Sequence, residues 1–201
     1  MEKGLLIVLS GPSGSGKGTV RAELMKKENF AFSVSATTRD PREGETNDVD
    51  YHFITREAFE GKIRREEMLE YTTYNGNYYG TVKREALEMI EAGKNLLLEI
   101  EVEGAMNVKR VYPEAVLIML LPPSFAEQEK RLRGRGTEPD EVVNGRLART
   151  YEEMEYLPQY DYVVYNEDVD ACAEDILSII HAERCAMRRH PDAKERYFGK
   201  F

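Results

Sequence analysis

The stretch Leu5-Leu6-Ile7-Val8-Leu9 leads directly into Ser10-Gly11-Pro12-Ser13-Gly14-Ser15-Gly16-Lys17-Gly18-Thr19 and then into a helical pattern that contains Val20 and Leu24. Glycines in such a loop let backbone N–H groups converge on phosphate oxygens, and the helix N-terminus adds a favourable dipole. Lys17 supplies a positive charge where β- and γ-phosphates bind. An apolar strand, this loop and a helix in that order predict a nucleotide-binding phosphate loop.

The position after Lys17 differs from the usual phosphate-loop pattern. That pattern has Ser or Thr directly after the lysine, whereas this chain has Gly18 before Thr19, so we do not expect a hydroxyl group to ligate Mg²⁺ directly from there. A second apolar run, residues 96–100, contains Glu99 near its end, where a carboxylate can lie beside the phosphate loop. Glu99 is therefore our candidate to hold Mg²⁺ through a water molecule.

Strand and helix patterns alternate outward from this loop. Four short apolar runs are candidates for buried parallel strands, at residues 5–9, 95–100, 115–121 and 161–165. Helical patterns cover residues 18–28, 83–92, 103–111, 124–133 and 168–188. Because this alternation is typical of βαβ units, it predicts an α/β fold with three layers, in which helices cover both faces of a parallel sheet.

Two stretches interrupt the alternation and are interpreted as insertions. Residues 33–80 contain strand-like segments at 51–54 and 68–74, and Asn75-Gly76 indicates a hairpin turn. Residues 124–158 are rich in arginine and long enough to form a lid that moves. We expect a core made of residues 1–34, 82–123 and 159–201, a subdomain at 35–81, and a lid at 124–158.

Composition excludes several other classes of protein. The 201 residues are 41% apolar and 32% charged, as in a globular protein, and the net charge of −9 argues against a general nucleic-acid binder. No apolar run approaches the roughly 20 residues of a membrane helix, and the N-terminus lacks a secretory signal, so we expect a cytoplasmic protein. The two cysteines and three histidines show no metal-ligand spacing, so we expect no transition metal.

Five motifs, in this order, resemble those of the guanylate kinase family, and the similarity runs from about residue 5 to residue 185. They are Gly11-Pro12-Ser13-Gly14-Ser15-Gly16-Lys17, Ser33-Val34-Ser35-Ala36-Thr37-Thr38-Arg39-Asp40-Pro41-Arg42, Asp50-Tyr51-His52-Phe53, Gly76-Asn77-Tyr78-Tyr79-Gly80-Thr81 and Gly134-Arg135-Gly136-Thr137. Several ordered motifs are far more specific than a phosphate loop alone. The resemblance implies an enzyme of purine nucleotide metabolism that transfers the terminal phosphoryl group of ATP, with Mg²⁺, to GMP or dGMP.

The resemblance also implies a GMP site in residues 35–81 and the adjacent core. Its phosphate-binding members are Arg39, Arg42, Tyr51 and Tyr79. Its base-reading members are Ser35, Glu70, Thr81 and Glu101. Glu70 makes chemical sense in this role, because its two oxygens can accept hydrogen bonds from N1–H and the 2-amino group of guanine, and adenine offers no such pair of donors. Two positions depart from the family pattern, since Thr81 is often Ser and Glu101 is often Asp.

The ATP side follows from the same resemblance. Residues implied to bind ATP are Gly11, Pro12, Ser13, Gly14, Ser15, Gly16, Lys17, Gly18, Thr19 and, near the adenine, Asn166. Residues implied to act in catalysis are Lys17, Arg39, Arg135 and Arg146. Phosphoryl transfer needs positioned cations more than a strong base, so arginines of the closing lid would act as built-in arginine fingers. We interpret Arg131, Arg133 and Arg149 as solvated helix charges.

Two other functions remain open at the level of sequence. A catalytically inactive, guanylate-kinase-like module would use the same fold to bind partner proteins, but such modules typically lose the phosphate loop, and here Lys17 and its glycines are present. A kinase for a different monophosphate would share the fold and the loop. Arg39, Arg42, Tyr51 and Glu70 together favour GMP.

Overall fold

A parallel four-stranded sheet forms the centre of the molecule in the computed structural model, which describes residues 3–74, 76–134 and 139–199. The strand order is β6-β1-β7-β8. The strands are β1 (Leu6–Ser10), β6 (Leu96–Glu99), β7 (Val116–Leu121) and β8 (Tyr162–Tyr165). Three of them lie within the apolar runs expected to be strands, β1 extends one residue beyond its run to Ser10, and all neighbouring strands are parallel.

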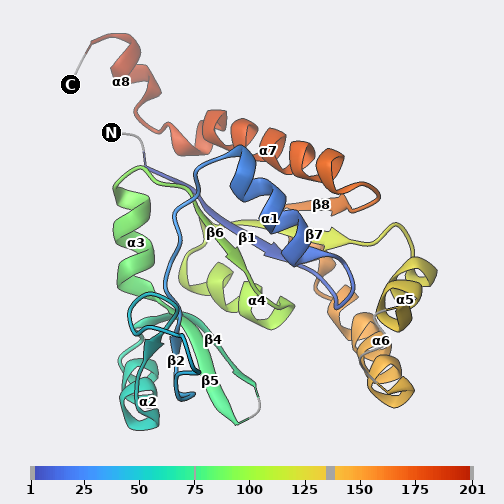
Figure 1. Cartoon of the computed structure of the whole chain (residues 1–201). Coiled ribbons are helices and arrows are strands. Elements are labelled where there is room, and N and C mark those ends of the chain that lie inside the picture. Colours follow the sequence, from blue (N-terminus) through green and yellow to red (C-terminus); the bar gives the residue numbers. More distant parts are fainter. Residues whose placement is uncertain (1–2, 75, 135–138, 200–201) are drawn as a thin grey trace.

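Helices cover both faces of this sheet (Figure 1). Helices α1 (Lys17–Lys27) and α7 (Val169–Cys185) share one apolar cluster with Ile7 and Leu9 of β1. Helices α3 (Lys83–Glu91) and α4 (Val102–Val111) share the other cluster with Leu6 and Val8. Because successive side chains of a strand point to opposite faces, β1 is buried on both sides, and the predicted three-layer α/β fold is confirmed.

A second, smaller sheet has the strand order β3-β2-β5-β4. Its strands are β2 (Ala36–Thr37), β3 (His52–Phe53), β4 (Met68–Tyr74) and β5 (Asn77–Val82), and the hairpin predicted between the last two is confirmed. Helix α2 (Arg56–Arg64) was not predicted. The sequence did contain a signal for it, because Thr is a favoured N-cap residue and stands at position 55. In the structure the Thr55 side chain accepts a hydrogen bond from the Ala58 N–H, and Phe59 is fully buried against this sheet.

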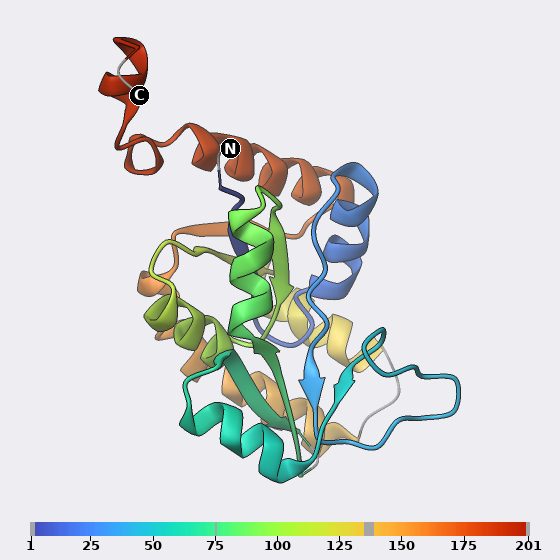
Figure 2. The ribbon, with the colours of Figure 1, turned by 90° about the vertical axis from the view of Figure 1, so that its left-hand side faces the viewer.

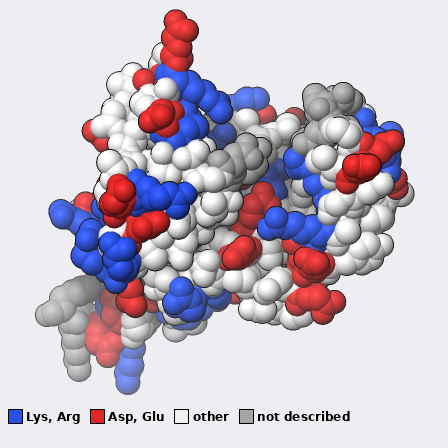
Figure 3. Space-filling view, turned by 90° about the horizontal axis from the view of Figure 1, so that it is seen from below, with Lys and Arg blue, Asp and Glu red and all other residues white. Residues whose placement is uncertain are grey.

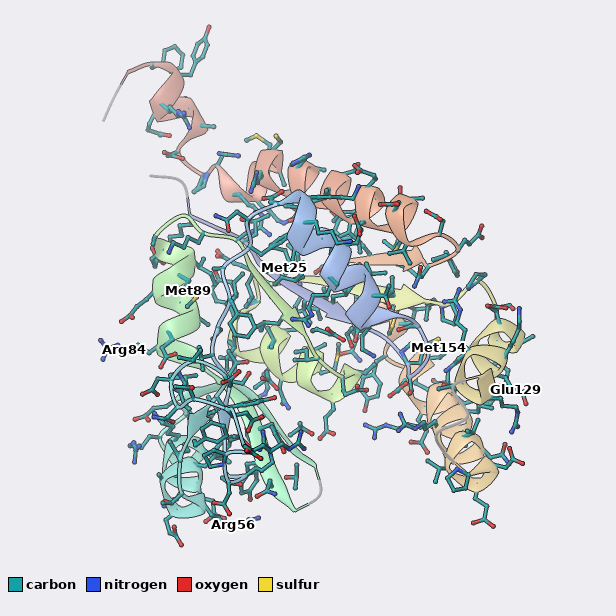
Figure 4. All side chains as sticks on the ribbon, viewed as in Figure 1. Met25, Arg56, Arg84, Met89, Glu129 and Met154 are labelled. Carbon is teal, nitrogen blue, oxygen red and sulfur yellow. The ribbon has the colours of Figure 1, made fainter. Side chains whose placement is uncertain are left out.

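Helices α5 (Phe125–Gly134) and α6 (Asp140–Met154) lie at the lower right of the central sheet in Figure 1, and the smaller sheet lies at its lower left. They pack through a small apolar cluster of Leu132, Val143 and Leu147. In Figure 4, Glu129 of α5 points away from the body, whereas Met154 lies where α6 reaches the core. The 3-10 turn η1 (Leu157–Gln159) then leads back to β8.

The C-terminal helix ends earlier than predicted. Helix α7 stops at Cys185 rather than at residue 188, and η2 (Met187–Arg189) and α8 (Ala193–Tyr197) follow. The side chains of Arg188 and Arg189 fold back onto the buried carboxylate of Glu183, which also accepts a hydrogen bond from the Tyr162 hydroxyl, and this requires a turn. Figure 2 shows α8 extending away from the body.

Within the described ranges, no helix is both long enough and apolar enough to cross a membrane. The two cysteines, Cys172 and Cys185, are both free.

Candidate functional site

The phosphate loop connects β1 to α1 through backbone that favours glycine. Gly16 is the N-cap of α1 with φ +91°, and a Cβ atom there would lie 2.3 Å from the Asn166 side-chain nitrogen. A Cβ atom on Gly11 would lie 2.1 Å from the Leu120 carbonyl oxygen. Both positions therefore require glycine. Gly16 needs it for its left-handed backbone conformation, and Gly11 needs it because β7 approaches closely.

Lys17 folds back over this loop. Its ammonium group donates hydrogen bonds to the carbonyl oxygens of Gly11, at 2.5 Å, and Pro12, at 3.4 Å. The Glu101 carboxylate lies 3.8 Å away on the other side, and the Lys17 side chain is only 10% exposed. The charge is thus held at the mouth of the loop, where an incoming phosphate can replace carbonyl oxygens as its partner.

Buried polar side chains from distant elements hold the loop in place. The Asn166 amide donates to the Ser15 carbonyl oxygen at 2.8 Å, directly after β8. Gln128 of α5 donates to the Ser13 carbonyl oxygen at 2.9 Å and to the Thr150 hydroxyl at 2.8 Å. Arg146 of α6 donates to the Ser13 hydroxyl at 2.7 Å. Helices α5 and α6 are therefore tied to the phosphate loop by side-chain hydrogen bonds.

A cleft runs between the phosphate loop and the small sheet. Figure 3 shows this face, with acidic and basic side chains both bordering the hollow between the two lobes. Seven of the residues singled out from the sequence line it, namely Lys17, Ser35, Tyr51, Glu70, Tyr79, Glu99 and Glu101. Thr81 lines an adjoining hollow with Ser35 and Glu70. Residues more than 80 positions apart in sequence thus share one cavity.

Glu70 is the buried carboxylate of this cleft. It is 5% exposed, and its Oε1 accepts a hydrogen bond from the Thr81 hydroxyl at 2.7 Å across the β4–β5 pair. Burial raises the pKa of Glu70, and the hydrogen bonds from Thr81 reduce that rise without removing it. The second oxygen faces the cleft beside Gly104 of α4. A ligand with paired N–H donors would satisfy this carboxylate.

Arg39 lies on the loop before β3 and is held by an acidic partner. Its guanidinium donates to both oxygens of Glu45, at 2.8 and 2.9 Å, and lies over the Tyr51 and Phe53 rings at 5.6 Å. Arg39, together with the Arg42 backbone N–H, lowers the pKa of Glu45 to about 2. The Arg42 side chain is exposed and does not line the cleft. The Tyr51 and Tyr79 rings meet edge to face at 6.0 Å.

Glu99, the proposed Mg²⁺ partner, lies beside the phosphate loop. Its Oε1 would lie 3.6 Å from a Cβ atom on Gly18, and its Oε2 pairs with Arg21 at 2.9 Å. One carboxylate next to a phosphate site suits Mg²⁺, which keeps several waters and takes its other oxygens from the nucleotide. In the part of the chain that the structure describes, no three His, Cys, Asp or Glu side chains cluster as a self-sufficient metal site.

The arginines of α5 and α6 differ in their surroundings. Arg131 was predicted to be a solvated charge, and this is wrong. Its side chain donates a hydrogen bond to the Asn166 carbonyl oxygen at 2.9 Å and pairs with Glu127. Arg133 pairs with Glu129 and Asp140 on the outer side. Arg149 lines the cleft, 3.3 Å from the buried Glu153. Arg135 lies outside the described residues.

Comparison with known proteins decides the family. The sequence pattern of the family described as guanylate kinase matches residues 3–183. The chain belongs to the guanylate kinase family. It is 50% identical over 193 residues to a guanylate kinase from Clostridium tetani, which covers 96% of this chain and 93% of the relative. It is 52% identical over 189 residues to one from Halalkalibacterium halodurans, covering 94% and 93%.

A solved guanylate kinase from Anaplasma phagocytophilum has the same fold. It superposes with a TM-score of 0.73 at 30% identity, and the match covers 100% of this chain and 97% of that one. The resemblance drawn from the five motifs is thus confirmed, and with it the α/β fold of the guanylate kinase family. The inactive protein-binding module loses its support, because the relatives that match over nearly the full chain are enzymes.

Glu45 and Gln128 contact residues of this candidate site and were not singled out in the sequence, and Arg149, interpreted as a solvated charge, lines the cleft. Glu45 had a local signal, since an acid stands three residues after Arg42 in the same loop. Arg149 had a weaker sequence signal, because it stands four residues before Glu153 and can pair with it on one helix face. Gln128 had none, because its partner Ser13 lies 115 residues away.

Proposed function

We propose that GMP binds in this cleft, with guanine against Glu70 and the monophosphate toward Arg39, and that ATP binds at the phosphate loop. The reaction is that of a guanylate kinase, transfer of the terminal phosphoryl group of ATP to GMP, giving ADP and GDP. The observation that carries the proposal is the buried Glu70 carboxylate, which opens into the same cavity as Lys17. The Glu70 carboxylate can bind the base and the Lys17 ammonium can bind the phosphates, so one cavity provides a group for each substrate.

Base selection follows from the chemistry of Glu70. Guanine presents N1–H and the 2-amino group as adjacent donors, and a carboxylate accepts from both. Thr81 already donates to Oε1 and thereby fixes the carboxylate plane, while Ser35 lies close enough to line the same wall. Glu101 stands at the mouth of the cleft beside Lys17, so its contact with the base is the less direct of the two acids.

The monophosphate would meet Arg39, Arg42, Tyr51 and Tyr79. The Arg39 guanidinium donates three hydrogen bonds within its own loop, two to Glu45 and one to the Asp40 carbonyl oxygen. These bonds fix the plane of the guanidinium, and its other N–H groups can donate to the monophosphate. The two tyrosines add neutral hydroxyl donors on the cleft side. Arg42 is the exposed member and would add charge from the rim.

The triphosphate would lie on residues 11–19. Backbone N–H groups at the start of α1 would bind its oxygens, and Lys17 would follow the transferring phosphoryl group. Mg²⁺, held beside Glu99 through water, would supply charge neutralisation on the phosphate oxygens. Arg146 already contacts Ser13 and would stabilise charge on the equatorial oxygens. Arg135 is proposed for the same role, and Asn166 for the adenine side.

Residues 35–81 and 124–158 are proposed to act as the GMP-binding subdomain and the lid. They flank the cleft on opposite sides of the core, so closure would exclude water from the transfer (Figure 1). Small-angle scattering with GMP plus a non-hydrolysable ATP analogue should show compaction. Unchanged scattering with both ligands bound would rule out this moving-lid proposal.

The experiment that tests substrate choice is turnover of GMP, dGMP, AMP and dTMP side by side with ATP and Mg²⁺. We expect kcat/KM to be highest for GMP and dGMP, because the proposed contacts involve the base and the monophosphate. Omitting Mg²⁺ should abolish turnover. Equal turnover of AMP would remove Glu70 from its proposed role. A place in purine nucleotide metabolism and a cytoplasmic location remain predictions from the sequence.

A further inference from the structure

His52 lies between two carboxylates. Its Nδ1 is 2.6 Å from an oxygen of Asp48, and its Nε2 is 3.0 Å from an oxygen of Glu85. Ionised carboxylates only accept hydrogen bonds, and a neutral imidazole has only one N–H to donate. Both contacts are therefore satisfied at once only when the ring is a doubly protonated imidazolium.

The two partners belong to different parts of the molecule. Asp48 lies in the exposed loop of residues 38–51, and Glu85 lies in the first turn of α3. Helix α3 is anchored in the core, because Ala86 and Ile90 pack with Leu6 and Leu96 of the central sheet. His52 thus ties the loop to an element that packs on the core.

The loop has few other means of being held. Residues 40–44 and 46–50 are exposed, and Asp48 adopts the left-handed φ of +63°, which is uncommon for a residue other than glycine. Most of its hydrogen bonds are internal, such as that from the Thr46 N–H to the Asp50 side chain. Strand β3 has only two residues and pairs with β2 alone.

Tyr51 directly precedes His52 and lines the cleft. Its ring contacts those of Phe53 and Tyr79, and the Arg39 guanidinium lies over it. A shift of the loop at His52 would therefore move Tyr51 and, through it, Arg39.

We propose that His52 is a positioning residue for GMP binding, which as an imidazolium held between Asp48 and Glu85 fixes the loop that presents Tyr51 to the monophosphate. This inference rests on the proposed role of Tyr51. The consequence is a pH-dependent affinity for GMP, a property that none of the phosphate-binding side chains explains near neutral pH.

The electrostatics of the ring agree with this geometry. Burial lowers the pKa of His52, but the hydrogen bonds to Asp48 and Glu85 outweigh burial, so the pKa is raised above its ordinary value of 6.5. Among the residues that the structure describes, Asp48 and Glu85 are the charged groups that contact the ring; its neighbour across the β3–β2 pair, Ala36, is uncharged. Because the folded-state pKa is raised, the tie is complete below pH 6.5 and is lost as the pH rises through the folded-state value.

The test is the pH dependence of KM for GMP in the wild type and in His52→Gln, from pH 6.0 to 8.5. Gln can still donate to one carboxylate but does not titrate. We expect KM to rise about twofold to fivefold more with pH in the wild type than in His52→Gln, as the loss of one partly exposed ion-pair contact predicts. Ionisation of GMP itself affects both enzymes equally. His181→Asn, at an exposed histidine on α7, is the matched control and should keep the wild-type profile.

Direct titration of His52 by NMR gives a second measurement that does not depend on catalysis. We expect a pKa above 6.5 that falls in Glu85→Gln and not in Glu88→Gln. Glu88 is the matched control on α3, since it pairs with Arg84, which points away from the body (Figure 4). A His52 pKa at or below 6.5 in the wild type would overturn the proposal.

Tyr51→Phe separates this inference from the proposed function. If it leaves KM for GMP unchanged, the proposed role of Tyr51 in the phosphate site is wrong and the inference falls with it. If it raises KM while the pH profiles of the wild type and His52→Gln superimpose, the site stands and only the role of His52 is wrong.

Discussion

The phosphate loop and the loop of residues 38–51 are both suited to hold phosphate, but by different means. The first offers backbone N–H groups at a strand-to-helix turn, where Leu120 and Asn166 leave no room for a Cβ atom at Gly11 and Gly16. The second offers side chains on a mostly exposed loop, held by Glu45 and His52. A backbone site is rigid because the core holds it, whereas a side-chain site is only as well positioned as its ion pairs. The predictions below test this contrast.

The largest loss should come from Lys17→Ala on the phosphate-loop side. We expect kcat to fall by about 10³-fold or more, because a positioned cation is lost where charge develops in transfer. Folding should be unaffected, since the lysine is bonded only to loop carbonyls and lies near Glu101. Steady-state kinetics and thermal unfolding check this, with Lys26→Ala, an exposed lysine of the same helix, as control. Near-normal turnover would remove the phosphate-loop assignment.

The next largest effect should come from Glu70→Gln, which changes the selection of guanine over adenine. We expect kcat/KM for GMP to fall by about 10²-fold or more, because the amide presents N–H against one of the two guanine donors. The ratio of GMP to AMP turnover should fall with it. Glu67→Gln is the matched control, a partly exposed carboxylate just before β4. An unchanged ratio would show that Ser35, Thr81 or Glu101 reads the base.

The same substitution should change stability in the opposite direction. Because burial raises the pKa of Glu70 in the folded state, the ionised carboxylate destabilises the fold at neutral pH, and this cost disappears as the pH falls toward its unfolded value. Glu70→Gln should therefore raise Tm at pH 7 relative to the wild type and reduce that advantage near pH 4.5. A lower Tm at pH 7 would mean that Thr81 and bound water fully compensate the charge.

Arg146→Ala should have a smaller effect that falls mainly on kcat. Arg146 contacts the phosphate loop rather than the GMP side, so we expect kcat to fall at least about tenfold with little change in KM for GMP. Arg133→Ala, whose side chain pairs with Glu129 and Asp140 away from the loop, is the control. An increase in KM for GMP without loss of kcat would assign Arg146 to the other side of the cleft.

The smallest effect should come from Gln128→Ala, which removes a contact holding the phosphate loop without touching substrate. We expect Tm to fall, since a buried hydrogen-bonded amide is worth about 1–3 kcal/mol when its partners are left unsatisfied. KM for ATP should rise a few-fold while KM for GMP stays constant. Glu129→Ala, on the outer side of α5, is the control. A change in KM for GMP would show that the two anion sites are coupled.

Much of the fold and part of the site could be predicted from the sequence. The central strands, the helices that cover them, the hairpin and the phosphate loop each carry a local pattern, because apolar periodicity and glycine-dependent backbone conformations act over a few residues. Seven of the side chains that line the cleft were also named from the sequence, four of them within the five motifs. Helix α2 was missed although Thr55 is a favourable N-cap residue, because no element was assigned to residues 56–64 between the two strand-like segments.

What only the tertiary structure decided is which side chains meet. Gln128 reaching Ser13, Arg131 reaching the Asn166 carbonyl, and His52 joining Asp48 to Glu85 each link elements that are far apart or differently oriented in the chain. The sequence alone determined that a phosphate loop follows a buried strand, because that geometry is local. It could not determine the partners of these polar groups, because hydrogen bonds and ion pairs depend on distances that packing of the whole chain sets.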